Sequence, residues 1–136
     1  MILIADSGST KVDWRVIARD GSSQAVTTAG INPYFQSAGQ ILDELRNNLI
    51  PYIKTDIKEV YFYGAGVAAD KIDVLKNCFN ELFPGVISNA YTDLLAAARA
   101  LCGKEAGIAC IMGTGSNSCF FDGENIADNV PACGYI

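Results

Sequence analysis

The 136-residue chain contains no histidine. This absence excludes Ser-His and Cys-His nucleophile pairs, zinc sites built with histidine, and acid–base catalysis by imidazole. Any catalysis in which this chain takes part therefore depends on carboxylates, hydroxyls, backbone N–H groups and a metal ion.

Excess positive charge, paired cysteines and long apolar runs are also missing. Lys and Arg number 10 against 15 Asp and Glu, and the net charge of −5 argues against nucleic acid or an anionic membrane as a partner. The five cysteines are far apart and form no C-x-x-C pair, so we expect free thiols. Because no signal-peptide pattern and no run of 18 apolar residues occur, we expect a soluble, cytoplasmic protein.

The chain opens with an apolar run that ends on Asp6, followed by Gly8 among Ser7, Ser9 and Thr10. The residues after this turn alternate between apolar and polar, as in a half-buried strand. A turn without bulky side chains lets backbone N–H groups approach a phosphate, and the hydroxyls of Ser7, Ser9 and Thr10 add further groups that can contact it. Asp6 can hold the divalent cation of a nucleotide. An ordinary hairpin turn is the alternative interpretation of the same residues.

Strands and helices alternate along the rest of the chain. The predicted elements are strands over 2–6, 11–16 and 23–28, a helix between a Ser37 cap and Pro51, a strand over 58–63, a helix over 70–83, a strand over 86–90, a helix over 92–103, and strands over 108–112 and 118–121. This βββαβαβα order predicts an α/β fold with a mixed sheet. Asp6, Gly64, Gly66 and Asp93 would then lie at the carboxyl edge of the sheet, where open α/β sheets bind ligands.

The pattern of the first turn recurs late in the chain, where Gly113, Thr114, Gly115, Ser116 and Asn117 follow a second apolar strand. Two matching loops are harder to explain as unrelated turns than one. We therefore expect two domains, an amino-terminal lobe over 1–105 and the start of a second, truncated lobe over 106–136.

These motifs together resemble the N-acetylglucosamine kinase and BadF/BadG-type ATPase family of the sugar kinase, heat-shock protein and actin superfamily. The resemblance is carried by residues 6–11, the Gly30-Ile31-Asn32 loop, Thr92-Asp93 and residues 113–117, in this order. It spans the whole chain but only about the first half of a typical member. It implies a ribonuclease-H-like (actin-like ATPase) lobe, followed by the first hairpin of a second, similar lobe.

The resemblance also implies ATP and Mg²⁺ as cofactors and a small-molecule sugar as substrate. The phosphate contacts would come from both hairpins, and the matching residues are Gly8, Ser9, Thr10, Thr114 and Gly115. Asp6 would lie near the metal ion, and Asp93 would act as the base on the accepting sugar hydroxyl. The alternative role of Asp93 is that of a helix cap, because Asp is favoured at the start of a helix.

Sugar contacts are implied for Asn32, Asn117, Gly134 and Tyr135, although many family members have Trp at the last of these positions. Gly66 joins them because of its place at the predicted ligand edge. Turn formation is the alternative role of Asn32 and Asn117. A homodimer is left open.

Three functions stay open from the sequence. The first is ATP-dependent phosphorylation of an amino sugar or related hexose, with this chain as the amino-terminal lobe and inactive alone, because the adenine pocket in the family belongs to the second lobe. The second is an ATPase that activates a partner dehydratase. The third is a module that binds sugar or nucleotide without turnover.

Overall fold

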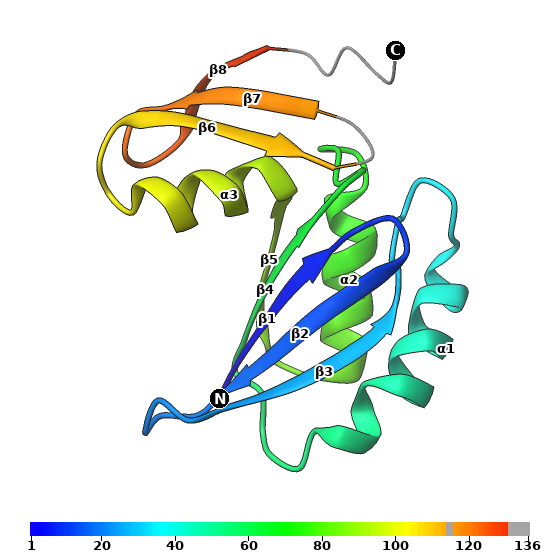
Figure 1. The fold of residues 1–136 in the computed structure, drawn as a ribbon. Coiled ribbons are helices and arrows are strands. Elements are labelled where there is room, and N and C mark those ends of the chain that lie inside the picture. Colours follow the sequence, from blue (N-terminus) through cyan, green and yellow to red (C-terminus); the bar gives the residue numbers. More distant parts are fainter. Residues whose placement is uncertain (114–115, 131–136) are drawn as a thin grey trace. The chain divides into compact units, whose positions relative to one another are not determined.

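The computed structural model describes residues 1–113 and 116–130 of the chain. They form two compact units, Met1–Thr92 and Asp93–Ile136, which are described separately below (Figure 1). The division after Thr92 precedes the boundary expected after residue 105, because α3 (Asp93–Cys102) packs against strands of the second unit. The assignment of two domains stays a prediction.

The first unit is built on a five-stranded sheet. Its strands are β1 (Ile2–Ser7), β2 (Lys11–Ile17), β3 (Ser23–Ala29), β4 (Glu59–Gly64) and β5 (Ile87–Thr92). They lie in the order β3-β2-β1-β4-β5. Strands β1, β2 and β3 pair antiparallel, whereas β1, β4 and β5 pair parallel. The predicted mixed sheet is therefore confirmed.

Two helices of the first unit begin and end close to the positions that the sequence predicts. They are α1 (Ala38–Asn48) and α2 (Ile72–Leu82). The Ser37 side chain accepts the N–H of Gln40, and the Gln40 side chain accepts the N–H of Ser37, which is the predicted capping box. Pro51 lies in a short 3₁₀ helix, η1 (Ile50–Tyr52), directly after α1.

Helices α1 and α2 cover one face of this sheet (Figure 1). Under them, the rings of Trp14 on β2, Phe62 on β4 and Phe79 on α2 are fully buried, with centroids 5.9 to 6.3 Å apart. The indole N–H of Trp14 donates to Thr28 Oγ1 at 2.9 Å, so its one polar atom is satisfied. This aromatic cluster joins α2 to the middle of the sheet.

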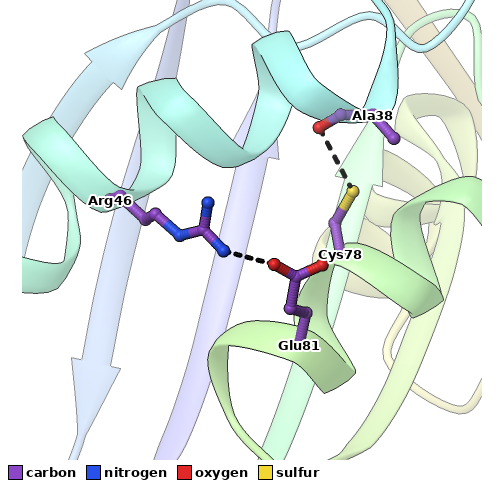
Figure 2. Close-up of polar contacts among 4 residues, drawn as sticks. All are labelled: Ala38, Arg46, Cys78 and Glu81. Atoms are coloured by element: carbon purple, nitrogen blue, oxygen red, sulfur yellow. Dashed lines mark hydrogen bonds and ion pairs between the residues drawn. The ribbon is translucent and has the colours of Figure 1, made fainter.

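Polar contacts between α1 and α2 add little to this packing. Arg46 on α1 forms an ion pair with Glu81 on α2, and the Cys78 thiol lies 3.8 Å from the carbonyl of Ala38 (Figure 2). About half of each charged side chain is exposed, and such surface pairs contribute roughly 0–1 kcal/mol. Burial of apolar side chains therefore holds the helices in place, and that burial raises the pKa of the Cys78 thiol.

The second unit contains α3 and an antiparallel sheet of β6 (Gly107–Met112), β7 (Ser116–Phe121) and β8 (Ile126–Val130). Helix α3 packs against β6 and β7, and Ala98, Ala109 and Phe121 are buried in this unit. The expected hairpin thus has a third strand, which the sequence did not predict because Ala, Asp and Asn in β8 have low strand propensity. Among residues 1–113 and 116–130, no helix combines the length and apolarity that a membrane crossing requires.

Candidate functional site

The three parallel strands of the first unit end together. Ser7 at the end of β1 is the cross-strand partner of Gly64 on β4, which in turn pairs with Thr92 on β5. The N–H of Ala65 donates to the carbonyl of Ser7 at 3.2 Å, so the loop after β4 leaves the sheet beside the loop after β1. The structure therefore places Asp6, Gly64 and Gly66 at the predicted carboxyl edge.

The turn between β1 and β2 is exposed and rests on a second loop. Gly8 N–H donates to the carbonyl of Lys11 at 2.9 Å, which closes the turn and leaves Ser9 and Thr10 at the surface. Gly30 N–H donates to the carbonyl of Thr10 at 3.0 Å, and a Cβ on Gly30 would lie 2.7 Å from the carbonyl oxygen of Ser9. The loop after β3 thus supports the turn from behind through direct backbone contact.

Ser7 does not contribute its hydroxyl to that turn. The side chain is buried, and its Oγ donates to the carbonyl of Ile31 at 3.0 Å. The expectation that Ser7 adds a hydroxyl for phosphate is therefore wrong. Strand alternation explains the difference, since Ser7 shares the core face of β1 with Leu3 and Ala5.

Asp6 lies on the opposite face of β1 and is exposed. Its cross-strand partners are Asp13 on β2 and Tyr63 on β4. The Asp13 carboxylate forms an ion pair with Lys11 at 2.8 Å, and the hydrogen bond from Lys11 lowers the pKa of Asp13. Lys11 thereby offsets the second negative charge opposite Asp6.

The donor set near Asp6 fits a magnesium ion better than a metal held by the protein alone. No group of three or more His, Cys, Asp or Glu side chains that could hold a metal is present in the part of the chain that the structure describes. Mg²⁺ at phosphate-binding sites needs only one or two carboxylates, because water and phosphate oxygens supply its other ligands. An exposed Asp6, two residues before Gly8, meets that requirement.

Asn32 and Gly66 come together at this edge from two different loops. Asn32 Oδ1 accepts the N–H of Tyr34 at 2.9 Å, which fixes the side-chain amide. Gly66 has φ +72°, and a Cβ there would lie 2.7 Å from Asn32 Oδ1 and 2.8 Å from Asn32 Nδ2. Only glycine both adopts this backbone conformation readily and leaves room for the amide.

The remaining predicted site residues belong to the second unit. Asp93 is the first residue of α3, is partly exposed, and accepts the N–H of Leu94 on Oδ1 at 2.9 Å. Asn117 lies on β7 and accepts the N–H of Ser118 on its own Oδ1 at 2.9 Å. The predicted site residues that lie outside the described part of the chain are Thr114, Gly115, Gly134 and Tyr135.

One residue of the site was missed by the sequence reasoning. The Oε1 atom of Gln36 accepts the N–H of Asn32 at 2.8 Å, and its Nε2 donates to the carbonyl of Gly30 at 3.2 Å. A glutamine four residues after an asparagine is too common in loops to attract attention. Its importance is visible only once the loop is folded.

Comparison with solved structures was informative, whereas no protein-family model and no curated protein matched the chain. A putative N-acetylglucosamine kinase from Porphyromonas gingivalis is 48% identical with a TM-score of 0.92, over 100% of this chain and 50% of its own. A second protein of the same name, from Chromobacterium violaceum, is 19% identical with a TM-score of 0.64, over 88% of this chain and 44% of its own. The ethanolamine utilization protein EutJ from Carboxydothermus hydrogenoformans is 10% identical with a TM-score of 0.60, over 98% of this chain and 52% of its own.

These similarities confirm two expectations. The chain is similar over its whole length to a protein named as a putative N-acetylglucosamine kinase, and it shares an actin-like ATPase fold with all three structures. The two more distant structures support the fold alone. The chain spans about half the length of each of these proteins: 50% of the Porphyromonas gingivalis protein, 44% of the Chromobacterium violaceum protein and 52% of EutJ.

Proposed function

We propose that the whole protein transfers the terminal phosphoryl group of ATP to a hydroxyl of N-acetylglucosamine, another amino sugar or a related hexose. The observation that carries this proposal is the 48% identity, over the entire chain, to a protein named as a putative N-acetylglucosamine kinase. In this proposal the chain forms the amino-terminal lobe and is inactive alone.

The turn between β1 and β2 would contact the phosphates of ATP. Gly8 N–H is engaged with Lys11, so contacts from this turn would come mainly from Ser9 and Thr10, which are exposed. Asp6 would hold Mg²⁺, which offsets phosphate charge when bound. Phosphoryl transfer needs positioning and electrostatic stabilisation rather than covalent catalysis, and a chain without histidine can supply both.

Asp93 would orient and deprotonate the sugar hydroxyl. Its Oδ1 accepts the N–H of Leu94, so in our proposal Oδ2 takes the hydroxyl proton. Asn32 and Gly66 would contact the sugar from the first unit. The second unit would add Asn117, Gly134 and Tyr135 at the sugar, and Thr114 and Gly115 at the phosphates.

The test is ADP release by the protein expressed from its complete reading frame, with Mg-ATP and a panel of hexoses and N-acetylhexosamines. We expect sugar-stimulated turnover that Asp93→Asn lowers roughly 10²- to 10⁴-fold while ATP binding is retained. Asp73→Asn is the matched control, because Asp73 also lies in the first turn of a helix and loses the same favourable interaction with the helix dipole.

Two results would contradict the proposal. Slow ATP turnover that no sugar stimulates would favour an ATPase that acts on a protein partner. Binding of ATP or sugar without any turnover would favour a binding module.

A further inference from the structure

The loop between β3 and α1 is held at both ends of its Gly30–Asn32 segment by one side chain. The Gln36 amide accepts the N–H of Asn32 at 2.8 Å and donates to the carbonyl of Gly30 at 3.2 Å. Through these two hydrogen bonds the side-chain amide engages the extended segment in the same way as the backbone of a neighbouring strand would. Both bonds are partly shielded from water, which makes their loss more costly than at an open surface.

The same segment is fixed from its other side by the sheet. The carbonyl of Ile31 accepts the buried Ser7 hydroxyl, and the Ile31 side chain is itself buried. Gly30 donates to the carbonyl of Thr10 in the turn between β1 and β2. Because Gly30 and Ile31 are fixed by these bonds, the hydrogen bond from Asn32 N–H to Gln36 determines the position of the backbone at Asn32.

The position of the Asn32 side chain depends on the position of this backbone segment. Its Oδ1 is occupied by the N–H of Tyr34, and its amide lies against Gly66. The other polar atom of the side chain, Nδ2, is a donor and is therefore the one that can meet a ligand oxygen. A shift of a few tenths of an ångström at Asn32 N would misdirect Nδ2, because hydrogen bonds weaken steeply with poor geometry.

We propose that Gln36 is a positioning residue for sugar binding, which acts only through Asn32 by holding its N–H and thereby the direction of its amide. This inference rests on the proposed function, in which Asn32 contacts the sugar. Gln36 itself touches neither ATP nor the reacting atoms in this proposal. Its loss should therefore weaken sugar binding and leave the chemical step and ATP binding unchanged.

The experiment is steady-state kinetics on the complete protein, with the sugar varied at saturating Mg-ATP and ATP varied at saturating sugar. Gln36→Ala should raise the sugar KM about three- to tenfold, with kcat and the KM for ATP unchanged. Gln36→Glu keeps the acceptor for Asn32 N–H but loses the donor to Gly30, so we expect a smaller increase. Gln40→Ala is the matched control, since Gln40 lies four residues after Gln36 and its side-chain oxygen accepts the backbone N–H of Ser37 at 2.9 Å.

A double-mutant cycle separates positioning from general support of the loop. If Gln36 acts only through Asn32, Gln36→Ala adds nothing to the sugar KM of an Asn32→Ala variant. If Gln36→Ala raised the sugar KM by the same factor in the unmodified protein and in the Asn32→Ala variant, the inference would be overturned. It would also be overturned if Gln36→Ala alone left the sugar KM unchanged. Absence of sugar-stimulated turnover in the unmodified protein would instead overturn the proposed function, and with it the inference.

Discussion

The contact between Gly66 and Asn32 makes a quantitative prediction for the Gly66→Ala substitution. Gly66 has φ +72°, and an alanine in the left-handed region costs about 1–2 kcal/mol. The new Cβ would lie 2.7 Å from Asn32 Oδ1, closer than any stable contact, so the amide must move. Movement breaks the bond from Tyr34 N–H, which adds about 1 kcal/mol. We expect a total loss of about 2–3 kcal/mol in the free energy of unfolding.

Gly85 provides a matched control for the backbone term. Its φ is +78°, nearly that of Gly66, but no atom lies within 4 Å of a Cβ placed there. Gly85→Ala should therefore cost only the strain of about 1–2 kcal/mol. The difference between the two variants, about 1 kcal/mol, isolates the displacement of Asn32.

The assay is urea unfolding followed by tryptophan fluorescence, together with the KM for sugar. Trp14 is the only tryptophan in the 136 residues and is fully buried, so its emission reports the unfolding of the first unit. We expect the sugar KM to rise in Gly66→Ala and to stay unchanged in Gly85→Ala. Equal unfolding free energies for the two variants would refute the reasoning, because they would show that Asn32 tolerates the added methyl group.

Three further predictions concern stability and can be read by the same unfolding assay. Phe79→Ala removes one ring of the aromatic cluster and should cost about 3–5 kcal/mol, whereas a loss below about 1 kcal/mol would mean that the cluster does not anchor α2. Ser7→Ala leaves the Ile31 carbonyl buried without its donor and should cost about 1–3 kcal/mol; no loss would show that the bond is dispensable. Burial raises the pKa of the Cys78 thiol, so the unfolded chain deprotonates first and the free energy of unfolding should fall as the pH rises past the ordinary thiol value of 9.0. Cys78→Ala should reduce that fall, and an unchanged pH profile would count against the assignment.

Much of the fold could be predicted because its signals are local. Alternation of apolar and polar residues marks β2, the Ser37–Gln40 capping box marks the start of α1, and Gly103 with φ +60° follows the end of α3. β8 escaped prediction because its residues have low strand propensity, and its place depends on pairing with β7. A strand that forms only because it pairs with a neighbouring strand is difficult to predict from the sequence.

For the candidate site, the residue types at the ends of the strands can be recognised from the sequence alone. Asp6 and the turn after it were identified in this way, because small and polar residues after an apolar run are a local pattern, whereas the role of Asn32 was suggested by the family resemblance. The parallel pairing of β1 and β4 then decided that Asp6, Gly64 and Gly66 share one edge.

The contacts that support these residues depend on the three-dimensional packing of the chain. Ser7 and Ile31 stand 24 positions apart in the chain, and their hydrogen bond exists because β1 lies beside β2 and β4 with its core face under the helices. Gln36 holds the backbone N–H of Asn32, and Gly66 lies against the Asn32 side-chain amide because two separate loops converge at one sheet edge. Such contacts join groups whose separation in sequence carries no period or motif, so the physical reason for each residue is found in packing and not in pattern.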